Sequence, residues 1–278
     1  MSSKNSAVAD GAMKLHQRSI VIDALDVSHF DRSHLEKMHA GGITACNATV
    51  AMPGANFRQS VDAIRDFDTL IEANSDIAMH AVTAADIEKA KAAGKVAIVY
   101  GFQNAVGLEG DPKLVKVFHA LGVSIIQLTY MTANVLGDGC LEPRNGGLTV
   151  FGKAVVRELN KHKIIIDLSH VGERTSLDAI EYSATPVAIS HACAKGLVNN
   201  PRNKSDEVIK AVVARGGTGA RPDKDGLSAT AYPSGVRGTP VEMILSAAEA
   251  PISSRRTRAT RSAARASPTT RRSATCRA

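Results

Sequence analysis

The sequence predicts an α/β protein of the (β/α)8 TIM-type barrel class, and three observations support this. Between residues 19 and 217, short apolar runs rich in Val and Ile alternate with polar loops and amphipathic segments. The runs hardly alternate between apolar and polar residues, as expected of strands buried on both faces of a parallel sheet. The unusual polar residues follow the strands, which favours a barrel over a doubly wound sheet. The predicted strands are Ile20–Ala24, Ile43–Val50, Val96–Phe102, Val123–Thr129, Ile164–Leu168 and Val187–Ile189.

The segments between these runs carry the signals of helices. In residues 57–70, apolar side chains recur every three or four positions and mark one helix face. Thr83 begins a capping box with Asp86. Asp111 followed by proline predicts a helix over residues 111–122, because proline is favoured at the first helical position. Two more helices are expected over residues 148–159 and from Ser205 to Gly216.

The composition changes towards the C-terminus. Residues 218–250 hold weak apolar clusters interrupted by Gly and Pro, and residues 251–278 are nearly all Arg, Ala, Ser, Thr and Pro. We therefore expect an N-terminal segment (1–18), a barrel portion (19–217), an irregular segment and an Arg-rich disordered tail. A seventh strand is expected to begin near Gly216, and the eighth has no candidate, so the barrel is expected to be incomplete.

The positive charge of the chain lies in that tail. Residues 251–278 contain eight arginines and no acidic residue. Subtracting these eight charges from the net +7 leaves the first 250 residues with a net charge of −1. A body without basic bias predicts no nucleic-acid partner.

Other features of composition predict a cytoplasmic protein that does not enter a membrane. No apolar run approaches the roughly 20 residues that cross a bilayer. The first residues lack the apolar core of a signal peptide. The four cysteines are far apart and form no CxxC pair, so neither a disulfide framework nor a cysteine zinc site is indicated.

Two histidines stand out from the nine in the chain. His170 and His191 each follow a serine at the end of a predicted buried strand. Neighbouring parallel strands would present both imidazoles at one rim, and two such ligands make half a catalytic zinc site. The alternative is a pair of buried, hydrogen-bonded histidines without metal.

Further polar residues near strand ends could complete a site. Carboxylates could hold a metal, a thiol could act as a soft ligand, and an amide could bind a metal weakly or hydrogen-bond a substrate. For each of them, a role in the local loop or turn is the alternative. These residues are Asp23, Asp26 and His29 after the first strand, Gln103 and Asn104 after the third, and Cys140 and Glu142 after the fourth.

A dipeptide Arg202-Asn203 follows the sixth predicted strand. An arginine at a barrel rim can bind a substrate carboxylate with two parallel hydrogen bonds. The alternative for Arg202 is a salt bridge with Asp206. We predict that Arg202 and Asn203 bind the substrate.

Taken in series, several motifs resemble the membrane (renal) dipeptidase family, peptidase family M19. The resemblance spans roughly residues 19–219 and also covers Asp23, Gly101-Phe102-Gln103 and Leu128-Thr129-Tyr130. The serial order is more specific than any single motif. The motifs are Asp167-Leu168-Ser169-His170, Pro186-Val187-Ala188-Ile189-Ser190-His191, Pro201-Arg202-Asn203-Lys204-Ser205-Asp206 and Gly216-Gly217.

This resemblance implies a (β/α)8 barrel with a binuclear zinc site that hydrolyses dipeptides. His170 and His191 match two zinc ligands of the family, and Arg202 matches its substrate-binding arginine. Gln103 stands where the family has a bridging glutamate, and Tyr130 stands where it has a histidine that assists the reacting centre. Both departures place Gln103 and Tyr130 in the predicted catalytic site.

A third departure concerns the first strand, where Leu25 and Val27 replace a His-x-Asp pair. Because these losses remove ligands and negative charge, we expect one zinc ion rather than two, and little or no dipeptidase activity. The expected partner is a dipeptide or another small-molecule substrate, and a homodimer is left open. The rival interpretations are a catalytically silent small-molecule-binding barrel and a fragment with no function of its own.

The fourth departure is the C-terminal part, which matches nothing in the family after the double glycine. A composition dominated by Arg, Ala, Ser, Thr and Pro is typical of out-of-frame translation of a GC-rich gene. We therefore hypothesise a frameshift or truncation from about residue 218 onward.

Overall fold

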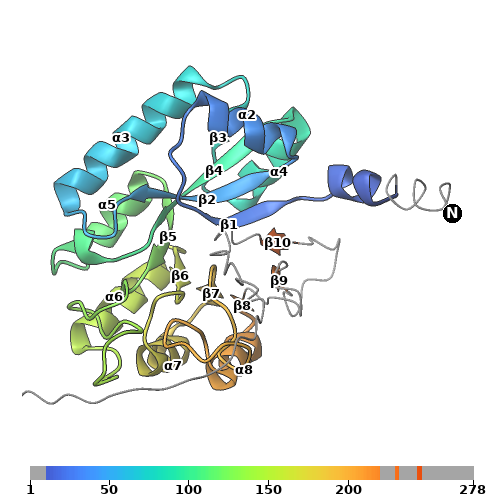
Figure 1. Cartoon of the computed structure of the whole chain (residues 1–278). Helices are drawn as coiled ribbons and strands as arrows, with labels where there is room; N and C mark the ends of the chain where they lie inside the picture. The colour runs from blue at the N-terminus through green and yellow to red at the C-terminus, as the bar shows by residue number, and fades with distance from the viewer. Residues whose placement is uncertain (1–10, 220–228, 232–242, 246–278) are drawn as a thin grey trace, which may run out of the picture. The chain divides into compact units, whose positions relative to one another are not determined.

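A computed structural model describes residues 11–219, 229–231 and 243–245. Their main feature is a parallel eight-stranded sheet with the order β1-β2-β4-β5-β6-β7-β8, in which β3 pairs with β4 outside this path. The helices lie on the outer side of the curved sheet (Figure 1). The fold is thus an incomplete α/β barrel of parallel strands, as the sequence predicts.

The strands agree with the predicted runs and add one that was not foreseen. Each predicted run overlaps a strand, and the seventh strand expected near Gly216 is present as β8. The unforeseen β3 is three residues long, too short for its apolar pattern to stand out. The strands are β1 (Ile22–Asp26), β2 (Ala45–Ala51), β3 (Ala78–His80), β4 (Val96–Phe102), β5 (Val123–Gln127), β6 (Ile165–Asp167), β7 (Ala188–Ile189) and β8 (Thr218–Gly219).

The helices follow the strands as in a barrel. A helix also runs through residues 11–18, before β1. None of the helices in the described part is long and apolar enough to cross a membrane. The labelled helices are α2 (Arg32–Ala40), α3 (Phe57–Ala73), α4 (Ala84–Ala93), the 3-10 turn η1 (Val106–Leu108), α5 (Leu114–Ala120), α6 (Val150–Lys161), α7 (Glu173–Tyr182) and α8 (Asp206–Ala214).

Local signals in the sequence set most helix ends. Thr83 and Asp86 form the predicted capping box at the start of α4, and Gly94 ends this helix in the left-handed conformation with φ of 65°. Ser205 caps α8 by accepting a hydrogen bond from the Val208 amide. The predicted start at Asp111 is wrong, because α5 begins only at Leu114. The Asp111 carboxylate instead accepts a hydrogen bond from the Lys113 amide and closes a turn.

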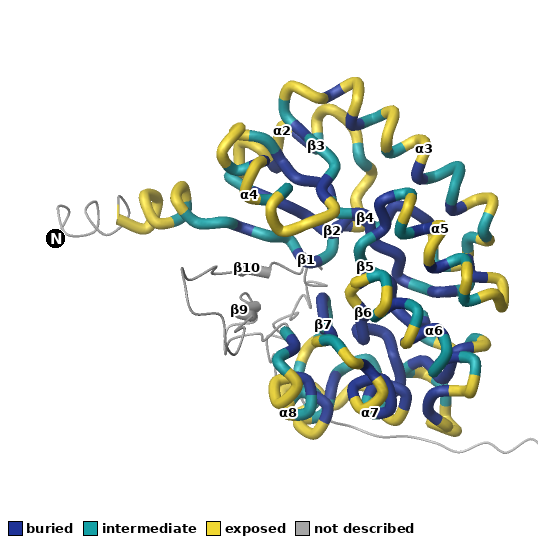
Figure 2. The backbone as a smooth tube through the Cα atoms, turned by 180° about the vertical axis from the view of Figure 1, so that it is seen from behind, coloured by how far each residue is buried: buried dark blue, intermediate teal, exposed yellow. Residues whose placement is uncertain are grey.

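The core lies between the sheet and the helices. In β2 and β4, nearly every residue is buried, as expected of strands covered on both faces (Figure 2). The outward faces of the helices are exposed. The largest fully buried side chains are Tyr100, Phe118, Leu35, Ile64, Ile98, Leu108, Ile126, Leu128, Leu136, Leu159, Ile164 and Ile166.

Gly101 allows a close approach at the end of β4. A Cβ atom at this position would clash with the Asn47 side-chain oxygen, so any larger residue would force the Asn47 side chain to move. The Asn47 amide donates to the Ala24 carbonyl oxygen over 2.9 Å and thereby ties β2 to β1. Glycine in the Gly101-Phe102-Gln103 segment therefore has a packing role at the rim of the sheet.

The predictions for the C-terminal part fall mostly outside the described residues. Within the expected irregular segment, 218–250, the structure describes β8, β9 (Ala229–Ala231) and β10 (Met243–Leu245), and β9 pairs antiparallel with β10. The expected disordered tail, 251–278, lies wholly outside the described residues. Among the strands of the main sheet that are described, β1 and β8 are the two ends of the order.

Candidate functional site

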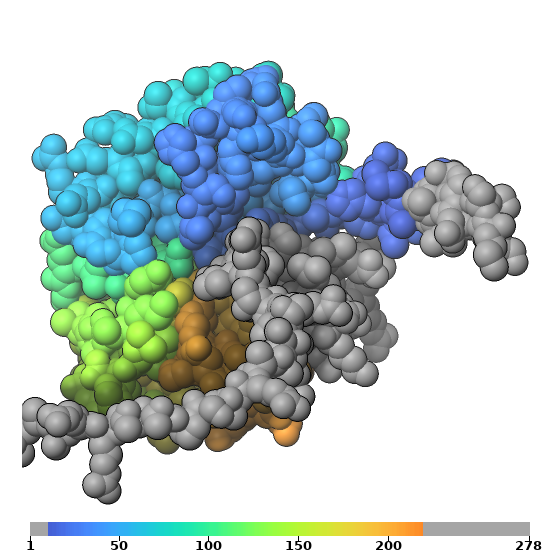
Figure 3. Space-filling model, in the orientation of Figure 1, coloured from blue at the N-terminus to red at the C-terminus, as the bar shows by residue number. Residues whose placement is uncertain are grey.

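The structure brings the two predicted histidines together. Strands β6 and β7 pair in parallel with Asp167 opposite Ala188, so the residues after each strand reach the same rim. The ring centroids of His170 and His191 lie 4.8 Å apart. The rim is the carboxyl end of the strands, where barrel enzymes place their active sites. In Figure 3, the chain from β1 to α5 borders the chain from α6 to α8 on one face of the molecule.

A buried carboxylate organises this rim. Asp167 Oδ1 accepts hydrogen bonds from Ser169 Oγ over 2.7 Å and from the Ser190 amide over 3.0 Å. Its Oδ2 accepts a hydrogen bond from Ser190 Oγ over 2.7 Å. The Asp167 side chain is therefore the link between β6 and β7. In the sequence, Asp167 stands out only as part of the Asp167-Leu168-Ser169-His170 motif, and nothing there shows this role.

The serine bonds fix the tautomer of His191. Because Ser190 Oγ gives its single proton to Asp167, the contact of 2.7 Å with His191 Nδ1 requires that Nδ1 carries a proton and donates it. His191 Nε2 then carries a lone pair, and this buried atom has no hydrogen-bond partner. Burial lowers the pKa of His191 to about 4, although the nearby Asp167 carboxylate opposes the shift.

Arg202 crosses the rim and contacts both strand ends. Its guanidinium donates to the carbonyl oxygens of Ser169 and His191 over 2.5 and 2.6 Å. It also lies 3.1 Å from His170 Nε2. Since a guanidinium can only donate, His170 Nε2 is the acceptor of this bond and the proton of the ring is on Nδ1. His170 Nδ1 is buried without a hydrogen-bond partner in the described structure.

Two causes keep His170 uncharged. Burial, together with the positive charges of Arg202 and Lys204, lowers the pKa of His170 to about 2. The rim therefore presents two neutral imidazoles beside a permanent cation.

A buried lysine that the sequence analysis did not single out supports the same loops. Lys204 Nζ donates to the Val171 carbonyl oxygen over 2.5 Å and contacts Ser176 Oγ at 3.3 Å. Burial, together with the Arg202 charge, lowers the pKa of Lys204 to about 7. Lysine is almost never fully buried unless its ammonium group has a partner, and no local sequence pattern could have shown this burial.

Tyr130 lies beside the histidine pair. Its ring centroid is 4.4 Å from that of His170. The next residue, Met131, has a positive φ of 62°. Its Sδ lies 3.8 Å from Cys140 Sγ, and the Cys140 amide donates to the His170 carbonyl oxygen over 2.9 Å. The loop after β5 thus packs on the histidine rim.

Gln103 lies at the end of β4 and has another set of partners. Its side-chain amide donates to Thr49 Oγ1 over 3.0 Å, and its backbone oxygen accepts from Gln127 Nε2 over 2.5 Å. Neither a hydrogen bond nor a ring contact connects Gln103 with Tyr130 or His170 among the described residues. Its catalytic role remains a prediction.

The remaining candidates make local contacts. The pKa of Asp23 rises to about 6, chiefly because the carboxyl is partly buried. Asp26 pairs with His34 at 2.7 Å, and His29 is exposed. Asn203 donates to the Val198 carbonyl oxygen over 2.8 Å within its own loop, so its substrate role also remains a prediction.

The other two candidates also bond to nearby backbone. Glu142 accepts a hydrogen bond from the Ala133 amide over 3.2 Å. Asn104 accepts one from the Ala105 amide over 2.9 Å. Each of these two side chains therefore contributes to the shape of its loop.

The residues at the rim do not fit a hydrolytic zinc centre. Such a centre needs three protein ligands and an open position for water. Of the two rim histidines, only His191 has an unpartnered lone pair, on Nε2, because His170 Nε2 accepts from Arg202. The Asp167 carboxylate lies 3.7 Å from His191 Nδ1, but both of its oxygens accept hydroxyl protons. No group of three His, Cys, Asp or Glu side chains in the described part of the chain could hold a metal ion.

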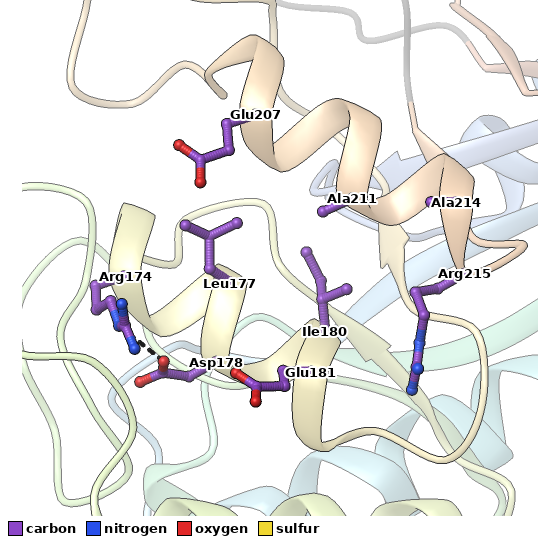
Figure 4. Close-up of a pocket in the computed structure, with 9 residues that line it drawn as sticks. All are labelled: Arg174, Leu177, Asp178, Ile180, Glu181, Glu207, Ala211, Ala214 and Arg215. Carbon is purple, nitrogen blue, oxygen red and sulfur yellow. Dashed lines mark ion pairs between the residues drawn. The ribbon is translucent and has the colours of Figure 1, made fainter.

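A groove on the outer helices is separate from this rim (Figure 4). It has a volume of about 410 Å³ and lies between α7 and α8. Leu177, Ile180 and Ala211 form part of its floor, and Arg174 pairs with Asp178 at 2.8 Å on its border. None of the strand-end residues described above lines it.

Comparisons with known proteins identify the family. Residues 4–218 match the membrane dipeptidase family, peptidase family M19. The chain belongs to this family, whose members are hydrolases. The family includes metallopeptidases, among them a dipeptidase of known structure, described as a metallo peptidase of family M19. That structure has 20% identity and a TM-score of 0.67 over 79% of this chain and 77% of its own, a likeness of fold alone.

Two other relatives are more similar in sequence. An amidohydrolase from Pseudomonas aeruginosa, of known structure, is 44% identical with a TM-score of 0.73, over 75% of this chain and 64% of that one. The dipeptidase tcpJ of Claviceps purpurea is 32% identical over 161 residues, which are 57% of this chain and 38% of the relative. The chain thus spans less than two thirds of the length of either relative.

Proposed function

We propose that this chain binds a dipeptide, or another small carboxylate, through Arg202 and hydrolyses it slowly or not at all. One observation carries the proposal: a permanent cation contacts one of two adjacent neutral imidazoles at the carboxyl end of the strands. A carboxylate ligand is a stronger hydrogen-bond acceptor for the guanidinium than a neutral ring, so it can compete for Arg202.

The proposal also explains why hydrolysis would be weak. Peptide hydrolysis by a metallopeptidase needs an activated water, and a metal supplies it when bound by enough ligands. Gln103 has a neutral side chain, so it cannot take a proton from water as a carboxylate does. Loss of such a general base typically reduces a rate about 10²–10⁴-fold. We propose that any zinc bound here is a single, weakly held ion.

We also propose that the protein is cytoplasmic, on the basis of its cysteines. Cys46, Cys140 and Cys193 are free thiols, which supports a reducing, cytoplasmic location.

Calorimetry with L-Ala-L-Ala tests the binding part. The full chain should bind the dipeptide, and Arg202→Met should reduce the affinity at least about tenfold, since a bidentate charged pair is lost. Arg58→Met is the matched control, because Arg58 is an exposed arginine on α3 with its side chain 86% exposed. The dipeptide amide, which lacks the carboxylate, should bind as weakly to the unmodified chain as the dipeptide binds to Arg202→Met. Equal affinities of both ligands for the unmodified chain would contradict the proposal.

A rate measurement tests the hydrolytic part. The unmodified chain with added zinc should release no more alanine from L-Ala-L-Ala than zinc alone. Robust zinc-dependent turnover would overturn this part of the proposal.

A further inference from the structure

Three hydrogen bonds of the Arg202 guanidinium lie where the two histidines meet. Two of its acceptors are backbone oxygens, one after β6 and one after β7, namely those of Ser169 and His191. The third is His170 Nε2, the nitrogen that carries the lone pair of that ring. One planar guanidinium therefore joins the two strand ends and uses the lone pair that a metal ion would need.

The charged groups around His170 favour the singly charged Arg202 guanidinium over a doubly charged metal ion. Arginine stays protonated at every accessible pH, so its charge cannot be removed by titration. Lys204, a second basic group, acts electrostatically on both rings. The Asp167 carboxylate is the facing acidic group, and its oxygens are bonded to Ser169 and Ser190.

We propose that Arg202 acts as an internal cation that competes with metal for His170, so that this chain excludes metal from the histidine pair. Arg202 is then a positioning residue that fixes the orientation and the tautomer of His170. Without Arg202, His170 Nε2 and His191 Nε2 would both offer a free lone pair to a metal ion, on rings whose centroids are 4.8 Å apart. Imidazole nitrogen is a common ligand for zinc, and two such donors hold an ion better than one.

The test is zinc binding by the full chain, measured by competition with a chromophoric chelator and without any dipeptide. Arg202→Met is close in length and removes the charge and the donors. It should bind one zinc ion at least about tenfold more tightly than the unmodified chain. Arg58→Met should leave zinc affinity unchanged, because Arg58 is an exposed residue of α3. Adding His170→Ala to Arg202→Met should abolish the gain.

Two outcomes would overturn the proposal. One is equal zinc affinity of the unmodified chain and Arg202→Met. The other is a gain that survives the additional His170→Ala. Circular dichroism shows whether each variant is folded. If Arg202→Met is unfolded, the neutral variant Arg202→Gln replaces it, and a failure of that variant to bind zinc more tightly would equally refute the proposal. Since no carboxylate ligand is added, the result is independent of the proposed dipeptide binding.

Discussion

The rim at β6 and β7 differs from the rim at β1 in how its polar groups are used. At β6 and β7, the Asp167 carboxylate and the Arg202 guanidinium each bond across the two strands. At β1, the Asp26 carboxylate accepts from the Ser28 amide over 2.8 Å and pairs with His34 in the next helix. In the first rim, charged side chains join two strands, whereas in the second the Asp26 carboxylate bonds to the loop and the helix that follow its own strand. The interactions that join neighbouring strand ends through charged side chains are thus found at β6 and β7.

The largest expected effect comes from removing the carboxylate that joins β6 to β7. Asp167→Asn should lower the free energy of unfolding by about 3 kcal/mol, because an amide nitrogen would face donors inside the protein. Asp26→Asn should cost only about 1 kcal/mol, since the amide oxygen can still accept from the nearby backbone. Urea denaturation measures both. A larger loss for Asp26→Asn would contradict the comparison.

The next effect is a pH dependence that comes from Lys204. Its pKa is about 7 in the folded protein and near its ordinary 10.5 in the unfolded chain, so the unfolded chain binds more protons between these values. The free energy of unfolding should therefore increase as the pH rises from about 7 to about 10.5. A neutral amine keeps two donor hydrogens, so the bonds to Val171 and Ser176 can persist.

Unfolding of the unmodified chain and of Lys204→Met at pH 7 and pH 9.5 measures this dependence. The unmodified chain should gain about 2 kcal/mol more than the variant between these two pH values. Equal changes in both proteins would show that Lys204 keeps its ordinary pKa.

The smallest effect is expected from adding ligands at β1. Leu25→His with Val27→Asp introduces the His-x-Asp pair that the resemblance to the family implies for this strand. Zinc affinity should change less than about twofold. Arg202 still hydrogen-bonds to His170 Nε2, and Val27 is 66% exposed. The chelator competition used for Arg202→Met measures this. Tight zinc binding by the double variant would show that the β1 rim, and not Arg202, limits metal binding.

The sequence was sufficient to predict the main strands and the position of the two histidines. Buried parallel strands leave continuous apolar runs, and the order of the runs places His170 and His191 on neighbouring strands. It was insufficient for β3, whose three residues are too few for a pattern, and for the start of α5, where Asp111 caps a turn instead.

The contacts within the site were less accessible from the sequence. The bond between Arg202 and His170, and the burial of Lys204, depend on how the loop after β7 folds back over the rim. The conformation of this loop depends on tertiary packing against the segment after β6, about 30 residues earlier in the chain. Residue type alone also could not show that Gln103 bonds to Thr49 on β2.

The zinc content of the purified chain tests the central claim most directly. The claim is that a metallopeptidase fold has kept its histidine pair but lost the ability to hold a hydrolytic metal centre. After dialysis against a weak chelator, elemental analysis should find less than one zinc ion per chain, and the same value within error for His170→Ala with His191→Ala. Two tightly held zinc ions per unmodified chain, lost in the double variant, would contradict the account.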